Sequence, residues 1–418
     1  MIHKVVIVGS GSRGIYMFAS PVLKEFKETC ELSGFFDINI LRAKAANQIL
    51  KVDLPVYNDF DKMLKEINPD ILVVTSNDAT HAEYIIKGLE KNKIVYSEKP
   101  ACTTIDQINQ IRSAVKKSKG HLFITHNMRY GNTMLKIKEL IDTGAIGKLL
   151  TIDFRETLDR NHGADYFRRW HGQKSNSGGL LIHKSSHHFD VINWIANSKA
   201  KSLNARGSIS FYGKNGPFRS KRCLGCEHAK NCTFYFDIKS HDTAKTLYHI
   251  PESEDGYFRD GCLFSENITT EDNASVIYHY ENGVLANYSL NAFASYEGML
   301  ISFEGTKGRI EYESAKSTQW AMGSNVIHGQ EKSYGSKLLL IHPTEGVTEI
   351  VVPKAEGSHG GSDPALRKDF FQAFLKNKEP QKNMASSEEG LQAVLVGAAA
   401  NISIAEGSRT IDVQSLLK

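Results

Sequence analysis

The feature that most constrains the fold is a glycine-rich stretch at the start of the chain. A run of mostly β-branched residues from Lys4 to Val8 is followed by glycines at positions 9, 11 and 14. The next segment, residues 15–26, has the apolar spacing of a helix. This G-x-G-x-x-G spacing between a strand and a helix predicts a βα unit whose helix N-terminus can hold a pyrophosphate. The expected cofactor contacts in this loop are Gly9, Ser10, Gly11, Ser12, Arg13 and Gly14.

A second apolar strand, residues 30–36, ends in Asp37, a little over twenty residues beyond the glycines. An acidic residue at this place binds a ribose 2′-OH and repels a 2′-phosphate. Asp37 therefore favours NAD over NADP. Arg42 is close enough in sequence to leave NADP open as the alternative.

Length and composition limit the class of protein. The chain has 418 residues, 41% hydrophobic and 23% charged, with a formal net charge of +4. This is long enough for two domains, and the small, mixed charge gives no reason to expect nucleic acid as a partner. The first strand starts at residue 4 with no signal peptide ahead of it, and no apolar run reaches a membrane-spanning length. We expect a cytoplasmic protein with no membrane partner and with reduced thiols.

Residues 1–128 alternate between strand-like and helix-like segments, which predicts a parallel sheet covered by helices. Ligands lie at the carboxyl edge of such a sheet. The loop after strand 70–75 places Ser76, Asn77 and His81 there, and the loop after strand 94–96 places Glu98 and Lys99 there. An ordinary solvated lysine is the alternative reading of Lys99, but Pro100 biases its backbone toward an extended conformation.

These motifs, together with Asn127-Met128-Arg129-Tyr130, resemble the Gfo/Idh/MocA family of oxidoreductases. The resemblance covers the first domain and much of the remaining chain, and Glu98-Lys99-Pro100 is its most specific motif. It implies a Rossmann domain, residues 1–128, and a substrate-binding and oligomerisation α/β domain, residues 129–418, with an open, largely antiparallel sheet. It also implies cofactor contacts from Glu98, Lys99 and Asn127, redox chemistry on sugars or polyols, and a homo-oligomer.

A histidine-rich stretch occupies residues 177–194. His183, His187 and Asp190 have spacings of four and three, which places them on one face of a predicted helix. Three interpretations remain open: polar residues of a domain interface, a metal site, and a general base for a hydroxyl proton.

The resemblance favours the base. Family members carry Gly-Gly-x-Leu-x-Asp-x-Gly-x-His-x-x-Asp at this place, and this sequence departs from the pattern at His183 and Ser185. The resemblance implies that His187 is the acid/base and that Lys99 polarises the reacting oxygen, with His183 as an orienting or second proton-transfer group. The roles of the two histidines can be exchanged.

Candidate substrate contacts are polar or aromatic residues suited to a polyhydroxylated ligand. They are Arg129, Tyr130, Trp170 and Asp190, with Arg155, Arg168 and Arg169 as further candidates. Each is equally compatible with a surface or packing role.

From about residue 203 the pattern is that of β-strands, interrupted by an insertion over about 213–272. The insertion contains Cys223, Cys226, Cys232 and Cys262. Four thiolates can form a tetrahedral structural zinc site, although the spacing is not that of a standard zinc ribbon. Buried free thiols are the alternative.

The sequence therefore predicts an NAD-dependent enzyme that transfers a hydride between the cofactor and a hydroxyl-bearing carbon of a sugar, polyol or sugar derivative. The alternative is a redox-neutral glycoside hydrolase or lyase that retains its NAD. His359-Gly360-Gly361-x-Asp363 is similar to a stretch of such glycosidases in the family. Their expected tyrosine-and-histidine motif near residue 180 is absent, and a helix start at Ser362 or Asp363 explains the same stretch.

Overall fold

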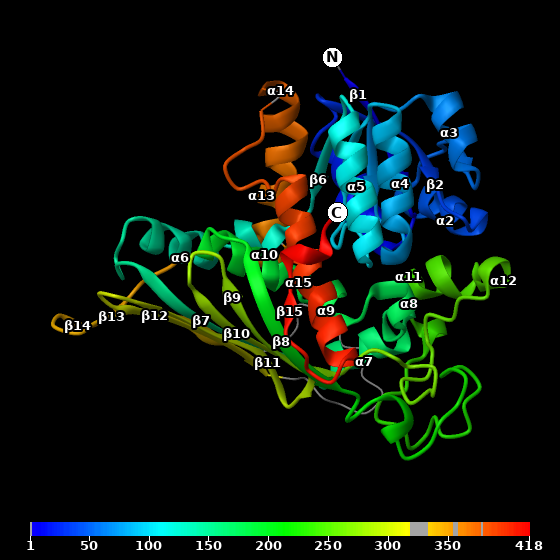
Figure 1. The fold of residues 1–418 in the computed structure, drawn as a ribbon. Coiled ribbons are helices and arrows are strands. Elements are labelled where there is room, and N and C mark those ends of the chain that lie inside the picture. Colours follow the sequence, from blue (N-terminus) through cyan, green and yellow to red (C-terminus); the bar gives the residue numbers. More distant parts are fainter. Residues whose placement is uncertain (1, 318–332, 354–357, 378) are drawn as a thin grey trace. The chain divides into compact units, whose positions relative to one another are not determined.

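The computed structural model describes residues 2–317, 333–353, 358–377 and 379–418. The chain forms two compact units (Figure 1). The first contains Met1–Tyr130, Ile238–Arg259 and Glu356–Val394, and the second contains Gly131–Asp237, Asp260–Ala355 and Leu395–Lys418. A linear division after residue 128 therefore misses two later segments that pack with the first unit.

The first unit contains a six-stranded parallel sheet in the order β3-β2-β1-β4-β5-β6. This is the strand order of a Rossmann fold, as predicted. Its strands are β1 (His3–Val8), β2 (Cys30–Phe36), β3 (Val56–Tyr57), β4 (Ile71–Val74), β5 (Ile94–Ser97) and β6 (His121–Ile124).

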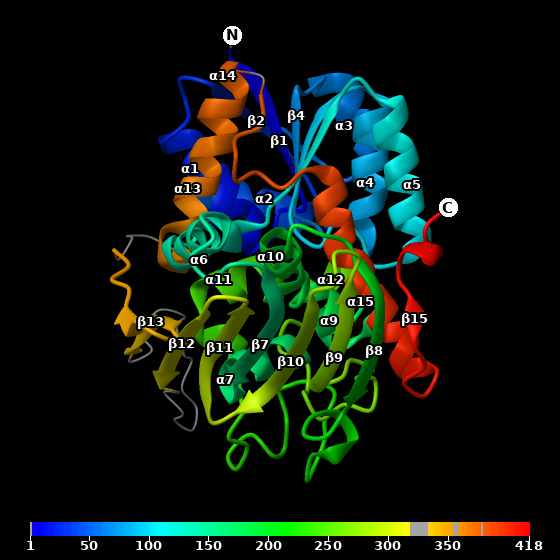
Figure 2. The same ribbon diagram turned by 60° about the vertical axis from the view of Figure 1, so that its left-hand side comes forward.

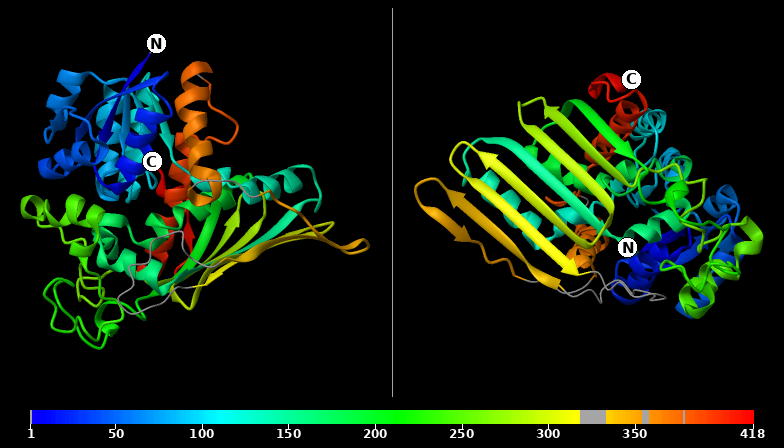
Figure 3. Two further views of the ribbon diagram at one scale, coloured as in Figure 1. Left: turned by 180° about the vertical axis from the view of Figure 1, so that it is seen from behind. Right: turned by 90° about the horizontal axis from the view of Figure 1, so that it is seen from below.

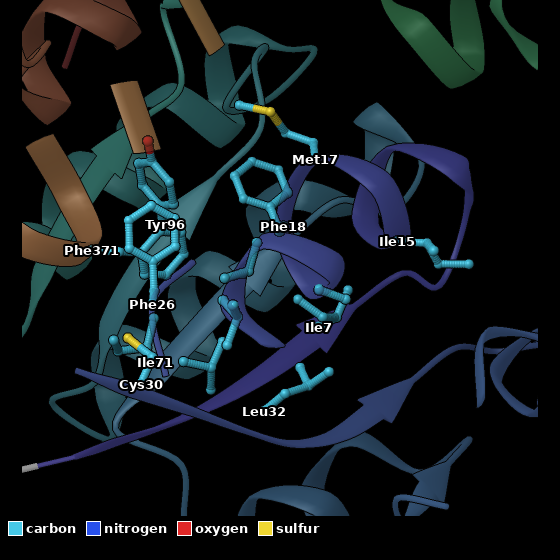
Figure 4. Packing of buried hydrophobic residues seen from close by; sticks show 14 of the residues in the cluster. Ile7, Ile15, Met17, Phe18, Phe26, Cys30, Leu32, Ile71, Tyr96 and Phe371 are labelled. Carbon is cyan, nitrogen blue, oxygen red and sulfur yellow. The ribbon is translucent and has the colours of Figure 1, made fainter. Parts of the chain in front are cut away.

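Helices cover both faces of this sheet (Figure 2). They include α1 (Ser20–Lys24), α2 (Ile40–Leu50), α3 (Phe60–Ile67), α4 (Asp78–Glu90), α5 (Ile105–Lys117), α13 (Ser362–Lys368) and α14 (Leu375–Asn377). The core between β1, β4, β5 and the helix after the glycine loop includes Ile7, Phe18, Ile71 and Tyr96 (Figure 4). Phe370, from the π-helical turn Asp369–Phe374, stacks on Tyr96 at 3.8 Å between ring centroids. Aromatic packing thus holds a late segment of the chain on the first sheet.

The helix after the glycine loop differs from the continuous helix predicted over residues 15–26. It begins as a π-helix, Gly14–Ala19, and continues as α1. Pro21 lies at the start of α1 and has no N–H to donate to the preceding turn. In the widened turn ahead of this proline, the backbone N–H of Ser20 donates to the carbonyl oxygen of Ile15.

The second unit contains a nine-stranded mixed sheet in the order β14-β13-β12-β11-β7-β10-β9-β8-β15. Only the central pair, β7 and β10, is parallel among the pairs described. The strands are β7 (Leu149–Asp159), β8 (Ala200–Ser208), β9 (Asn273–Tyr280), β10 (Leu285–Ala294), β11 (Tyr296–Gly305), β12 (Arg309–Ser317), β13 (Ser333–His342), β14 (Gly346–Glu349) and β15 (Ile411–Asp412). This confirms the predicted open, largely antiparallel sheet.

One face of this sheet carries helices and the other is open across the described residues (Figure 3). The helices are α6 (Asn132–Asp142), α7 (Arg160–Arg168), α8 (Lys174–Ser177), α9 (Leu180–His183), α10 (Ser186–Ala196) and the end of α15 (Ser387–Ala405). Strand β9 alternates buried and exposed residues, as expected when one face is covered.

Strand β8 ends at Ser208, earlier than the predicted end at residue 212. The carboxylate of Asp272 accepts hydrogen bonds from the backbone N–H groups of Ser210, Phe211 and Tyr212. These N–H groups are therefore satisfied without continuing the strand. The insertion then contains the short helices α11 (Asp242–Ala244) and α12 (Glu252–Asp255) and the π-helix Lys245–His249.

Within the residues described, no helix has both the length and the apolar character needed to cross a bilayer.

Candidate active site and dinucleotide site

The glycines of the first loop are required by close backbone contacts. Gly9 has φ of +94°, and a Cβ there would lie 2.5 Å from the backbone nitrogen of Ser76. A Cβ on Gly14 would lie 2.6 Å from the carbonyl oxygen of Gly9. Both positions therefore exclude side chains, which brings the loop after β4 directly against the glycine loop.

Asp37, at the end of β2, is held in place from three sides. Its carboxylate accepts hydrogen bonds from the backbone N–H of Ser10 at 2.8 Å and of Asn39 at 2.9 Å. Arg42 Nη1 donates to it at 3.1 Å. The carboxylate thus lies beside the glycine loop, where the sequence predicts the cofactor's ribose.

Glu98 and Arg13, both predicted cofactor contacts, are paired with each other. Arg13 Nε donates to Glu98 Oε1 at 2.7 Å, and Arg13 Nη1 donates to Asp363 Oδ2 at 3.2 Å. Asn127 Nδ2 donates to Asp363 Oδ1 at 2.7 Å. Although burial lowers the pKa of Arg13, the charges of Glu98 and Asp363 raise it above its usual value. This cluster joins the glycine loop, the Glu-Lys-Pro loop and α13.

Asp363 therefore does not start a helix as its N-cap, which was one interpretation of the sequence. The N-cap of α13 is Gly361, with φ of +85°. No local pattern indicated a partner for Asp363, because Arg13 lies 350 residues away. The side chain of His359 lies outside the described residues.

Lys99 follows β5 at the carboxyl edge of the first sheet, as predicted. Its backbone N–H lies 3.2 Å from both Glu98 Oε2 and Thr125 Oγ1. The backbone at Lys99 is therefore fixed by the neighbouring loop and by the ion pair of Glu98.

The loop after β4 holds itself together through Ser76, Asn77 and His81. Asn77 caps α4, accepting from the backbone N–H of Ala79 at 3.1 Å, and Ser76 Oγ lies 2.8 Å from Thr80 Oγ1. His81 is 1% exposed, and its ring nitrogens lie 2.7 Å from Pro100 O and 3.0 Å from Ser76 O. Burial lowers its pKa. His81 thus ties the Glu-Lys-Pro loop to the loop after β4.

Two predicted substrate contacts of the first unit have polar partners inside that unit. Arg129 is buried, and its guanidinium pairs with Glu389 at 2.8 Å. Tyr130 belongs to the hydrophobic core and forms a hydrogen bond with Asp369. A substrate contact from either residue stays a prediction.

In the second unit, the predicted single helix through His183, His187 and Asp190 is broken. His183 ends α9, whereas His187 and Asp190 lie in α10. The break falls at Lys184 and Ser185, and the Ser185 hydroxyl donates to the carbonyl oxygen of Leu180 at 3.1 Å. The common face therefore holds for His187 and Asp190 only.

Tyr288 of β10 anchors this break. Its hydroxyl lies 2.8 Å from Ser185 Oγ and 2.8 Å from His188 Nδ1. His188 is thereby directed to the sheet, and Ser185, at the place of a family glycine, has a structural partner. This partner was not apparent from the sequence because it lies on another strand.

His183 is enclosed by aromatic rings. Its ring centroid lies 4.1 Å from that of His171, 5.3 Å from that of Tyr166 and 5.7 Å from that of Trp170. His171 and Trp170 are themselves stacked at 3.6 Å. Of the predicted substrate contacts, Trp170 is thus beside a predicted catalytic residue, and the sequence did not identify Tyr166 and His171.

Lys184, which follows His183 in the sequence, forms a buried ion pair with Glu156 of β7. Lys184 Nζ lies 3.5 Å from Glu156 Oε1, and His188 Nε2 lies 3.8 Å from Glu156 Oε2. Burial raises the pKa of Glu156 to about 7, although Lys184 acts to lower it. Neither the strand pattern of Glu156 nor its neighbours in sequence indicated this raised pKa.

The three further arginine candidates are accounted for by other contacts or by exposure. Arg169 Nη1 pairs with Asp165 at 3.0 Å, and Arg168 Nη2 donates to the carbonyl oxygen of Phe234 at 3.2 Å. Arg155 is exposed on β7.

The four cysteines of the insertion line one cavity, together with Phe218, Phe234 and other residues. None of them forms a disulfide. Burial raises the pKa of Cys223 to about 11 and raises that of Cys232. Across the described parts of the chain, however, no three His, Cys, Asp or Glu side chains are grouped so that they could hold a metal ion. A zinc site therefore stays a prediction.

The first unit has the donors and acceptors that a dinucleotide requires: a glycine loop at a helix N-terminus and a carboxylate at the end of β2. With a mixed α/β second unit, this architecture is that of a two-domain protein with a dinucleotide-binding fold. A family model described as the oxidoreductase family, NAD-binding Rossmann fold, matches residues 3–126. The corresponding C-terminal alpha/beta domain matches residues 138–413. The chain belongs to the Gfo/Idh/MocA oxidoreductase family.

Individual relatives agree with this assignment. The chain is 31% identical to the putative oxidoreductase YteT of Bacillus subtilis, over 96% of each chain. It is 26% identical to an inositol 2-dehydrogenase of Klebsiella pneumoniae, over 56% of this chain and 70% of the relative. The fold is shared with a levoglucosan dehydrogenase solved with NADH and levoglucosan, with a TM-score of 0.68, 18% identity, and coverage of 99% of this chain and 100% of the other.

Proposed function

We propose that the chain is an NAD-dependent dehydrogenase of a sugar, a polyol or a related carbinol, with His187 as the acid/base. NAD, when bound, supplies the hydride acceptor. His187 takes the proton of the substrate hydroxyl, and the Lys99 ammonium stabilises negative charge on the oxygen as the proton leaves. His183 orients the substrate or His187 within its aromatic enclosure.

The observation that carries this proposal is the arrangement of α10 on its sheet. Tyr288 holds Ser185 and His188, which fixes the first turn of the helix that carries His187. A general base must be held within hydrogen-bond reach of its proton, and a helix anchored in this way provides such positioning. The inositol and levoglucosan dehydrogenases among the similar proteins support the substrate class.

The preference for NAD over NADP is part of the proposal. Asp37 has an ordered carboxylate, and Arg42, the residue available for a 2′-phosphate, is already paired with it at 3.1 Å. A 2′-phosphate would displace this pair and approach a buried carboxylate, which costs free energy.

The proposal is tested with His187→Asn, assayed by nicotinamide absorbance on a panel of sugars and polyols. We expect kcat to fall by about 10²–10⁴-fold, the usual contribution of a general base. The dissociation constant for NADH, measured by fluorescence titration, should stay unchanged. The matched control is His279→Asn, which replaces an exposed histidine of β9 in the same unit.

An unchanged kcat in His187→Asn would refute the assignment of His187 as the base. In the same assay, Lys99→Met tests whether Lys99 polarises the reacting oxygen. Consumption of substrate without net reduction of NAD would instead support the redox-neutral glycosidase, which no described contact favours.

We further propose that the four cysteines bind a structural zinc ion and that the open face of the second sheet forms an interface between copies of the chain. The cavity that the four cysteines share supports the proposed zinc site.

The proposed interface is supported by Ile277 on β9 and Leu300 on β11, which are 51% and 39% exposed, because apolar side chains on an open sheet are stabilised by a partner surface. Light scattering should give a multiple of the 46.6 kDa chain mass, and Ile277→Lys should reduce it. A monomeric wild-type protein would refute the interface.

A further inference from the structure

The segment Ile238–Arg259, here called the strap, comes from the insertion but belongs to the first unit. Its Leu247 side chain is fully buried and is part of the core cluster that includes Ile15 and Phe18. Asn39 Nδ2 donates to the carbonyl oxygen of Pro251 at 2.8 Å, and Arg42 Nε donates to that of Leu247 at 3.1 Å. The strap is therefore fixed to the part of the Rossmann fold that faces the predicted dinucleotide.

Tyr248 of the strap reaches the glycine loop. The backbone N–H of Ser12 donates to the Tyr248 hydroxyl at 3.1 Å, and a Cβ on Gly11 would lie 3.5 Å from the same oxygen. Backbone N–H groups at this place bind the oxygens of a pyrophosphate. A phenol can also donate its own proton, so the hydroxyl is placed to give a further hydrogen bond to a phosphate oxygen.

Asp255 of the strap completes the surroundings of Arg42. Arg42 Nη2 donates to Asp255 Oδ2 at 2.6 Å, while Nη1 donates to Asp37 and Nε to Leu247 O. The side chains of Arg42 and Asp255 are 10% and 16% exposed. Although burial raises it, the hydrogen bond from Asn39 and the charge of Arg42 bring the pKa of Asp255 below its usual value.

All three nitrogens of the Arg42 guanidinium thus have a partner, and two of the partners are carboxylates. A ribose 2′-phosphate would need the same guanidinium. It would have to displace one carboxylate and remain close to the other.

We propose that the strap is a component of the dinucleotide site in which Tyr248 binds the pyrophosphate and Asp255, by occupying Arg42, excludes NADP. The proposal rests on the NAD preference proposed above and assigns part of it to a residue outside the Rossmann sequence. Asp255 is a specificity-determining residue and Tyr248 a contact common to both dinucleotides.

The test is direct binding of NADH and NADPH by fluorescence titration of the full chain, without substrate. Asp255→Asn removes the charge and keeps the shape. We expect NADPH to bind about tenfold more tightly relative to NADH, which corresponds to about 1.4 kcal/mol. Asp255→Glu keeps the charge and should keep the wild-type ratio of the two dissociation constants.

Tyr248→Phe removes only the hydroxyl. Both dinucleotides should bind about fivefold more weakly, the usual effect of one hydrogen bond, with their ratio unchanged. The control is Tyr16→Phe, which removes the 3.2 Å contact of an exposed tyrosine with Thr243 at another part of the strap. It should leave both dissociation constants unchanged.

The outcomes separate the two proposals. A wild-type protein that binds both dinucleotides equally refutes the NAD preference itself. A wild-type preference for NADH that persists in Asp255→Asn refutes only the role of Asp255. Equal binding by Tyr248→Phe would overturn the role of Tyr248, and tighter binding would show in addition that the hydroxyl competes with the pyrophosphate for the N–H of Ser12.

Discussion

The insertion between β8 and β9 has two parts with different surroundings. The strap places Leu247 in the core of the first unit and has backbone carbonyls that accept from Asn39 and Arg42. The rest, residues 213–237 and 260–272, belongs to the second unit and surrounds the cysteine cavity. The strap is thus ordered by packing into a core, whereas the proposal for the cysteine part is cross-linking by a metal ion. Substitutions in each part distinguish these two modes of stabilisation.

The largest expected effect concerns metal in the cysteine part. We expect about one zinc ion per chain by elemental analysis of the purified protein. Its removal by a chelator, or Cys226→Ser, should lower the free energy of unfolding of this part by about 5 kcal/mol or more, since structural zinc binding is strongly coupled to folding. Limited proteolysis should then cut within residues 213–237, while NADH binding is retained.

A metal-free protein that resists proteolysis equally well would contradict this prediction. The cysteine part would then be ordered by its ion pair and apolar contacts, as the strap is.

The next effect concerns Asp260, which is fully buried. It accepts from Arg222 Nη2 at 2.6 Å and from the backbone N–H of Leu224 at 2.9 Å. Asp260→Ala removes a buried carboxylate partner of Arg222 and should cost about 3–5 kcal/mol in denaturant unfolding. Glu266→Gln, at the exposed ion pair with Arg219, is the control and should cost no more than about 1 kcal/mol. Equal effects would show that Asp260 does not hold the cysteine part together.

The smallest of the three effects concerns the strap. Leu247→Ala leaves a cavity in the core of the first unit and should cost about 2–4 kcal/mol of unfolding free energy. NADH binding should weaken as well, because Tyr248 is the next residue. Ile250 of the strap is 58% exposed, so the control Ile250→Ala should change neither the free energy of unfolding nor the affinity for NADH. If Leu247→Ala is as stable as the wild-type protein, the strap is stabilised mainly by its polar contacts and not by the burial of Leu247.

The dinucleotide loop could be predicted from the sequence because its determinants are local. Gly9, Gly14 and Asp37 lie within one βα unit and its next strand, so their spacing alone indicates the geometry of the loop. The turn at Gly283, with φ of +89°, is equally local.

The remainder depends on contacts between distant residues. Asp255 lies 213 positions from Arg42, and Tyr288 lies 103 positions from Ser185. His183 and His187 have a helical spacing in the sequence, but the helix is broken between them, and Tyr288 of β10 anchors that break. A pattern in a short stretch of sequence cannot reveal a contact with a residue a hundred or more positions away. For the same reason Arg129 and Tyr130 could not be separated from surface residues until Glu389 and Asp369 were seen beside them.

The register of β8 and β9 has one more consequence, for how this chain can be re-engineered. Ser208 is paired directly with Asn273, so the chain leaves the sheet and returns to it at adjacent positions. A tight two-residue turn can span such a pair. The β8–β9 ladder therefore does not depend on the insertion: a short hairpin could join the two strands, but the shortened chain would lose Leu247 from the core of the first unit.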